Sequence, residues 1–127
     1  MSIASMLLVG IGGFLGAVCR YFVQAWAERR FASVFPYGTL LVNVSGSFLL
    51  GALLGIGVPI NWQKLQLLAG TGFLGAFTTY STFASESLQL VRDGRKGKFL
   101  VYQIATYCLG IGGAAAGYAL AFIITMD

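Results

Sequence analysis

Four long apolar stretches, separated by three short polar connections, limit the folds that are open to this chain of 127 residues. The stretches cover residues 3–26, 37–57, 65–91 and 99–124. A helix that crosses a bilayer needs about 20 mostly apolar residues, and each stretch is at least that long. The sequence therefore predicts an all-α membrane protein with four transmembrane helices, forming a single domain over residues 1–127.

Composition supports a lipid environment and excludes several classes of function. Hydrophobic residues make up 57% of the chain and charged residues 9%, with a mean hydropathy of +0.82. Soluble domains carry about 25% charged residues. We therefore expect a multi-pass membrane protein. Cys19 and Cys108 lie deep within apolar stretches and are expected to be small buried side chains.

Enzymatic and nucleic-acid functions have little support in the sequence. The chain has no histidine, the commonest general base and metal ligand. It also offers no pairing of nucleophile and base and no cluster of metal ligands, so an enzyme is disfavoured. The basic residues are not interleaved with aromatic residues as on a nucleic-acid surface. Transport or membrane scaffolding are the classes that remain.

Charge in the connections predicts how the chain is oriented. The connections after the first and third stretches carry six basic residues, whereas Lys64 is the basic residue on the opposite side. Positively charged loops remain in the cytoplasm, so both termini are expected outside the cell. The six basic residues are Arg29, Arg30, Arg92, Arg95, Lys96 and Lys98.

Asn43 is the most polar residue of the second stretch. Thr39 lies four residues before it and Ser47 four residues after it, which places all three on one helix face. Hydrogen bonds between helices would account for such residues. We favour a polar stripe along a pore, because an amide and hydroxyls together offer several donors to an anion.

Arg20 and Glu86 are ionisable residues inside apolar stretches, where such groups mark functional sites by default. Arg20 lies near the end of the first stretch. It either extends to the membrane interface or faces a water-filled vestibule, where it would attract anions. Glu86 either makes a structural hydrogen bond or takes part in proton or ion movement.

The third stretch contains the passage GFLGAFTTYSTF, which is poorly suited to a continuous helix. Gly72 and Gly75 remove side chains, and the following hydroxyl residues can satisfy backbone groups that leave the helix. Irregular backbone at membrane depth survives only where protein or a cavity covers it. A break here would expose carbonyl oxygens such as those of Gly75 and Thr78 to a hard cation. It would also turn Tyr80 and Phe83 toward one face.

Three motifs together resemble the Fluc (CrcB) fluoride channels: GGFLGAVCR in the first stretch, PYGTLLVN in the second and TGFLGAFTTYSTFASE in the third. The resemblance covers the whole chain in length and number of spans. It implies an antiparallel dimer of four-span subunits with a broken third helix. It also implies passive, selective export of fluoride, which lowers the cytoplasmic fluoride concentration.

The resemblance also implies roles for individual residues. Asn43 matches the pore asparagine, and Tyr80 and Phe83 match paired aromatic positions whose ring edges line the fluoride path. Gly75 and Thr78 match the third-span break, whose main-chain oxygens from both subunits hold a structural sodium ion that is not transported. The remaining polar positions of the implied fluoride pathway are Arg20, Thr39, Ser81, Thr82 and Glu86.

The sequence departs from the family pattern in two respects. The first aromatic position is typically phenylalanine and is Tyr80 here, whose hydroxyl would either block the path or donate a hydrogen bond. In the fourth stretch the polar line runs from Tyr102 to Thr106 and then lapses at Gly110 and Ala114. We therefore expect that one ion pathway through this subunit is impaired.

The charge of the connections also bears on which chain forms the partner subunit. An antiparallel homodimer needs one chain to insert in both directions, which a strong charge bias disfavours. The chain is therefore expected to pair with itself or, as our hypothesis, with an oppositely oriented homologue.

Two other classes of membrane protein fit the sequence less well than a channel does. Small proton-coupled multidrug antiporters also have four spans, but they need a carboxylate in the first span, and this chain has no acid before Glu28. A non-transporting scaffold would explain the many glycines, but not Asn43 together with a broken third helix.

Overall fold

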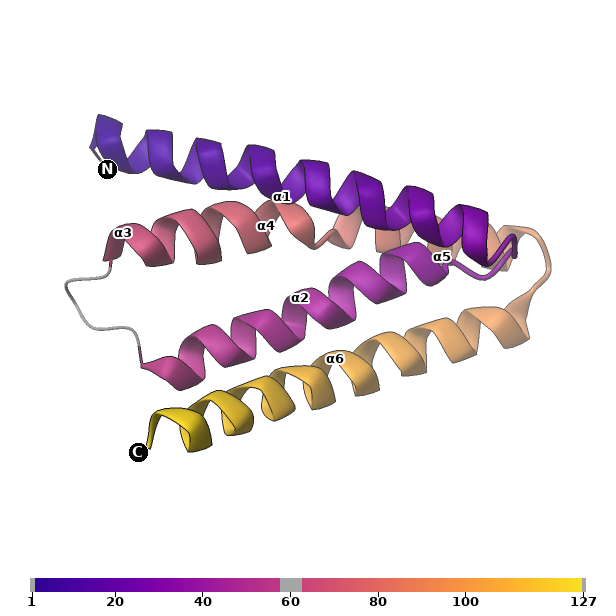
Figure 1. Cartoon of the computed structure of the whole chain (residues 1–127). Helices are drawn as coiled ribbons and strands as arrows, with labels where there is room; N and C mark the ends of the chain where they lie inside the picture. The colour runs from indigo at the N-terminus through magenta and orange to yellow at the C-terminus, as the bar shows by residue number, and fades with distance from the viewer. Residues whose placement is uncertain (1, 58–62, 127) are drawn as a thin grey trace.

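The computed structural model describes residues 2–57 and 63–126, and in that part of the chain its regular elements are all helices, which confirms the all-α class (Figure 1). Helix α1 begins and helix α6 ends at the same end of the molecule (Figure 1). In chain order the elements are α1 (Ile3–Arg30), α2 (Tyr37–Ile56), α3 (Gln63–Leu65), the π-helix η2 (Gln66–Leu74), α4 (Gly75–Phe77), α5 (Tyr80–Arg92) and α6 (Lys96–Thr125).

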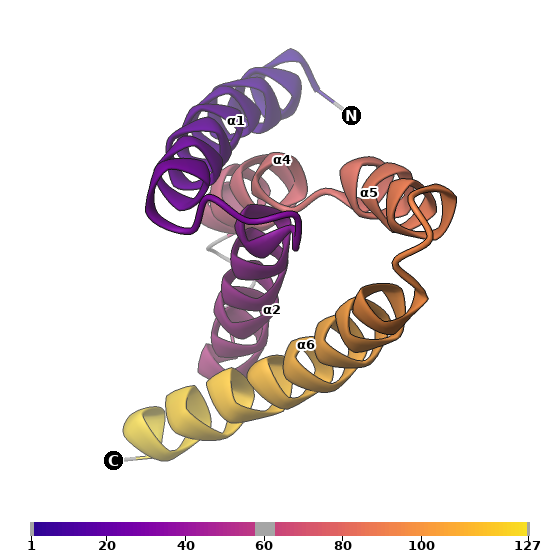
Figure 2. The ribbon, with the colours of Figure 1, turned by 90° about the vertical axis from the view of Figure 1, so that its right-hand side faces the viewer.

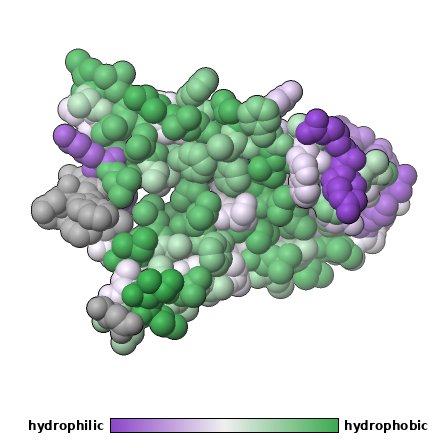
Figure 3. Space-filling model, in the orientation of Figure 1, coloured by the Kyte–Doolittle hydropathy of each residue, from purple (hydrophilic) through white to green (hydrophobic). Residues whose placement is uncertain are grey.

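Among the described residues, three helices are long and apolar enough to cross a membrane, namely α1, α2 and α6. Large apolar side chains cover their outer faces: Phe14 is 69% exposed and Ile111 is 72% exposed. Hydrophilic surface gathers at the end where α1 leads into α2 and α5 leads into α6, while the length of the helices is hydrophobic (Figure 3). Such an exterior suits lipid or another membrane protein.

Local signals explain where the helices begin and end. The Ser2 hydroxyl caps α1 by accepting a hydrogen bond from the Ser5 N–H at 3.1 Å. Arg29 and Arg30 lie in the last turn of α1, where positive charge complements the helix dipole. Helix α2 ends at Ile56, and the next residue, Gly57, adopts a left-handed conformation with φ of 67° that favours glycine.

The third apolar stretch forms several short elements rather than one helix. Thr78 and Thr79 are both extended, with φ/ψ of −83°/157° and −147°/118°. Helix α5 begins directly afterwards, because the Thr79 hydroxyl accepts a hydrogen bond from the Thr82 N–H at 3.2 Å. The two extended threonines therefore separate α4 from α5.

Glycines allow the helices to approach closely. A Cβ atom at Gly16 in α1 would overlap the Phe73 carbonyl oxygen of η2. A Cβ atom at Gly51 in α2 would likewise overlap the Ala114 carbonyl oxygen of α6. Small residues at such crossings are typical of membrane helices. Seen from the end of the bundle, α2 lies between α1 and α6 (Figure 2).

The expectation that both cysteines are buried is wrong. Cys19 and Cys108 are free and exposed. In a subunit with few helices, much of each apolar helix faces outward, so apolar neighbours in the sequence do not place a side chain inside.

Candidate functional site

A cavity of about 390 Å³ lies beside the two extended threonines and is called the Asn43 cavity below. Helix α2 contributes Asn43 and Ser47 to its lining, and α6 contributes Thr106 and Tyr107. The third stretch contributes the residues predicted for the aromatic pair and the sodium site, namely Gly75, Thr78, Tyr80 and Phe83.

Asn43 is tied to the extended backbone by two hydrogen bonds, which together we call the Asn43 clasp. Its Nδ2 donates to the Thr79 carbonyl at 3.0 Å, and the Thr79 N–H donates to Asn43 Oδ1 at 2.8 Å. In a continuous helix that N–H would bond to the carbonyl of Gly75. Asn43 therefore makes hydrogen bonds between helical segments, which was the alternative to a polar stripe along a pore. It also lines the cavity.

The aromatic residues beside the clasp form a cluster. The ring centroids of Tyr80 and Phe83 lie 6.0 Å apart. Phe83 is buried, and its ring meets Tyr102 at 5.1 Å and Tyr107 at 6.1 Å, the latter at an interplanar angle of 88°. Tyr80 is instead 76% exposed. The two predicted aromatic positions thus share the cavity, but one faces the interior and the other the outside.

Two buried hydroxyl oxygens have no hydrogen-bond partner within the described residues: those of Tyr102 and Thr106. Buried polar groups nearly always find a partner, so each exception asks for an explanation. Thr106 lines the Asn43 cavity. The hydroxyl oxygen itself is buried, so a change of rotamer would be needed to bring it to the surface of the cavity.

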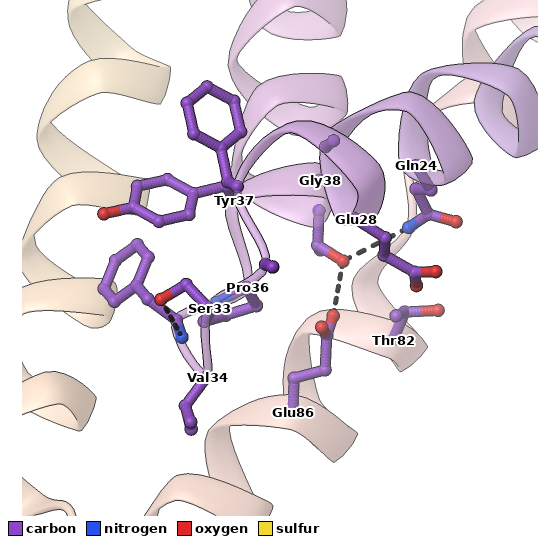
Figure 4. Close-up of a pocket in the computed structure, with 14 residues that line it drawn as sticks. Gln24, Glu28, Ser33, Val34, Pro36, Tyr37, Gly38, Thr82 and Glu86 are labelled. Carbon is purple, nitrogen blue, oxygen red and sulfur yellow. Dashed lines mark hydrogen bonds between the residues drawn. The ribbon is translucent and has the colours of Figure 1, made fainter.

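A second cavity, of about 550 Å³, lies where α1 leads into α2 and is called the Glu86 cavity (Figure 4). The predicted residues Thr39, Thr82 and Glu86 line it, together with Gln24 and Glu28. The Thr39 hydroxyl donates to the Glu86 carboxylate and accepts a hydrogen bond from Gln24 Nε2 at 3.2 Å. This Gln24–Thr39–Glu86 chain joins α1, α2 and α5.

The polar stripe predicted on α2 is divided between the cavities, with Thr39 in one and Asn43 and Ser47 in the other. Arg20 is half-buried and Ser81 is exposed, and neither lines these two cavities.

Sequence reasoning missed Gln24 and Thr79. Gln24 carried a signal, because it is an amide inside an apolar stretch, one turn after Arg20. Nothing in the sequence distinguishes Thr79 from Thr78, because the role of Thr79 depends on its backbone N–H and carbonyl.

Comparison with known proteins covers nearly all of the chain. Residues 7–118 match the family model described as CrcB-like protein, Camphor Resistance (CrcB). The fluoride-specific ion channel FluC 1 of Geobacillus kaustophilus (strain HTA426) is 51% identical over 112 residues, which cover 88% of this chain and 93% of the relative.

Two further relatives bear similar names. The fluoride-specific ion channel FluC 2 of Bacillus thuringiensis subsp. konkukian (strain 97-27) is 48% identical over 114 residues, covering 90% of this chain and 94% of the relative. The fluoride-specific ion channel FluC of Anaeromyxobacter dehalogenans (strain 2CP-1 / ATCC BAA-258) is 43% identical over 123 residues, covering 95% of each chain.

These similarities and the apolar helices α1, α2 and α6 identify a multi-pass protein of the plasma membrane. The relatives are named as ion channels, so the family is one of transporters and not of enzymes. On the match over residues 7–118 and on identities of 43–51% across most of its length, this chain belongs to the CrcB family.

Proposed function

We propose that this protein is a fluoride-selective channel that lets fluoride leave the cell passively and so lowers its cytoplasmic concentration. The observation that carries the proposal is the Asn43 clasp, which borders a cavity lined by aromatic rings and by Thr106, whose hydroxyl has no hydrogen-bond partner in residues 2–57 and 63–126. The names of the relatives support the same substrate.

The chemistry of fluoride explains why these groups belong together. Fluoride is small and strongly hydrated, so a dry pore must replace its water with hydrogen-bond donors. The side-chain amide of Asn43 has two N–H bonds, and the Thr79 carbonyl takes one of them. The other N–H and the Thr106 hydroxyl would serve the ion.

The aromatic cluster would supply the rest of the environment. An aromatic ring is negative on its face and positive at its edge, so an edge can face an anion. Phe83 lies in the cavity wall between Tyr80 and Tyr107. A narrow path between such edges would exclude larger halides by size.

The Glu86 cavity would form the next part of the pathway. Thr39 and Thr82 contribute hydroxyl groups there. Arg20 lies one turn before Gln24 on α1, and its positive charge would attract anions to this end. Ser81, at the start of α5, completes the proposed set and would act from the exposed side of the helix.

A structural sodium ion fits the break in the third stretch. The Thr79 N–H bonds to Asn43, which takes away the helical partner of the Gly75 carbonyl. Gly75 is exposed, and among the described residues no atom of another element lies within 4 Å of an added Cβ. Carbonyl oxygens are the ligands that hard cations prefer, so the main-chain oxygens of Gly75 and Thr78 would hold the ion. It would link two subunits and offset the charge of nearby anions.

The assembly that we propose is an antiparallel dimer of four-span subunits, with η2, α4 and α5 together forming the third, broken span. The exposed apolar faces of the helices leave room for a partner. The six basic residues of two connections favour one orientation of this chain, so the partner is either a second copy or an oppositely oriented homologue. A C-terminal tag found equally on both sides of the membrane would rule out the need for a homologue.

The decisive experiment is efflux from liposomes that contain the purified chain, followed with fluoride- and chloride-selective electrodes. Fast fluoride release with negligible chloride release is the expected result. If the chain alone releases neither ion, it is co-expressed with an oppositely oriented homologue and tested again. Absence of fluoride release in both assemblies would overturn the proposal.

A further inference from the structure

The Gln24–Thr39–Glu86 chain contains one residue to which neither the sequence motifs nor the proposed pathway assigned a role, namely Gln24. Its amide reaches Thr39 across the α1–α2 crossing. Gly38 makes this approach possible, because a Cβ at that position would lie only 3.2 Å from the Gln24 Cα. Figure 4 shows Gln24 on α1 and Glu86 on α5 at the two ends of the dashed hydrogen bonds.

The hydrogen-bonding capacity of a hydroxyl gives Gln24 a specific effect. A threonine hydroxyl has one proton to donate and two lone pairs that accept. Gln24 donates to the oxygen of Thr39, and the single proton of Thr39 goes to Glu86. Thr39 is 2% exposed, so water has little access to compete for these positions.

We propose that Gln24 is a positioning residue, which orients the Thr39 hydroxyl and thereby holds the Glu86 carboxylate in the conformation that lets fluoride pass. This rests on the proposed function of the channel. Without the Gln24 N–H, the Thr39 hydroxyl can rotate, and Glu86 loses a fixed donor.

A second glutamine provides a matched control. Gln103 of α6 donates to the Ser87 hydroxyl at 2.7 Å, one residue beyond Glu86 in α5. Both glutamines thus donate to a buried hydroxyl at a helix crossing, but only Gln24 acts on the hydroxyl that bonds to Glu86. If helix packing were the sole role of such bonds, the two positions would respond alike.

The test compares Gln24→Met with Gln103→Met, since methionine keeps the side-chain length but cannot donate a hydrogen bond. Fluoride efflux is measured from liposomes that contain either the chain alone or the chain with a homologue. The assembly used is the one in which the unchanged chain releases fluoride. Gln24→Met should slow efflux about fivefold, because that factor corresponds to the loss of one hydrogen bond. Gln103→Met should slow efflux less than about twofold.

A double-mutant cycle separates positioning from a general structural effect. On a Thr39→Val background the target of Gln24 is gone, so adding Gln24→Met should cause no further loss of efflux. If Gln24→Met lowers efflux on the Thr39→Val background by the same factor as in the unchanged chain, the proposal is overturned. Equal losses for Gln24→Met and Gln103→Met would do the same.

An infrared measurement gives a readout that does not depend on transport. The difference spectrum between the unchanged chain and Glu86→Gln identifies the carboxyl band of Glu86. Gln24→Met should shift this band and Gln103→Met should leave it in place. A band unmoved by Gln24→Met overturns the proposal. Lack of efflux by the unchanged chain, both alone and together with a homologue, instead refutes the proposed function.

Each variant is first checked for a single, sharp elution peak in size-exclusion chromatography. If Gln24→Met does not fold, Gln24→Asn replaces it in every measurement, because its shorter amide cannot reach Thr39 in the same position.

Discussion

The two polar clusters of this protein are built differently. The Asn43 clasp joins a side chain to the backbone of Thr79, whereas the Gln24–Thr39–Glu86 chain consists of side chains alone. Backbone groups between two helices cannot rotate away, but hydroxyl, amide and carboxyl groups can change rotamer. The clasp should therefore maintain both fold and function, while the chain should tune function with less effect on the fold.

Asn43→Leu should have the largest effect, because it leaves the N–H of the buried Thr79 without a partner and its carbonyl with only the first hydrogen bond of α5. One unpaired buried group costs about 1–3 kcal/mol and one lost hydrogen bond about 1 kcal/mol, so we expect destabilisation of about 2 kcal/mol or more. Efflux should fall about 100-fold or more, since a proposed ion ligand is lost as well. Thermal unfolding in detergent and liposome efflux measure the two effects.

Ser45→Ala is the control for this change. Ser45 lies on the same helix, and its hydroxyl donates to the Leu41 carbonyl at 2.6 Å within that helix. Ser45→Ala should change neither the unfolding temperature nor the fluoride efflux appreciably. Normal efflux by Asn43→Leu would remove the clasp from the proposed pathway.

Thr39→Val should have the next largest effect and should separate function from stability. The change removes both hydrogen bonds of the chain but leaves Gln24 and Glu86 in contact with a cavity. We expect efflux to fall about tenfold, with destabilisation below that of Asn43→Leu.

Thr39→Ser keeps the hydroxyl and should restore most of the efflux. A loss of stability in Thr39→Val as large as that of Asn43→Leu would contradict the distinction between the two clusters.

Thr106→Val should have a smaller effect on efflux and the opposite effect on stability. The Thr106 hydroxyl is buried and lacks a partner among the described residues, so removing it relieves an unpaired group. We expect the unfolding temperature to stay level or rise, while efflux falls about fivefold because a proposed donor to fluoride is lost. Unchanged efflux would show that the Thr106 hydroxyl takes no part in conduction.

Tyr80→Phe should have the smallest effect. Tyr80 is 76% exposed, and its ring centroid lies 6.0 Å from that of Phe83. Because phenylalanine keeps the ring edge, efflux should stay within about twofold of the unchanged chain and chloride should remain excluded. A larger fall would assign the hydroxyl itself to the pathway or to the partner interface.

Much of the helical framework could be predicted from apolar length. The predicted stretches 3–26 and 37–57 correspond to α1 and α2, and 99–124 lies within α6. The burial of single side chains could not be predicted in this way. Phe83 is buried and Tyr80 exposed although both are aromatic residues of one helix, because packing against α6 covers only one of them.

The sequence by itself determined that the chain is helical and apolar, and that Asn43 shares a helix face with hydroxyl residues, since these properties follow from composition and local periodicity. Tertiary structure alone decided which groups meet. Thr79 is 36 residues from Asn43, and Glu86 is 47 residues from Thr39. Hydrogen bonds across such separations depend on how closely glycines let the helices approach, and local sequence does not encode that distance.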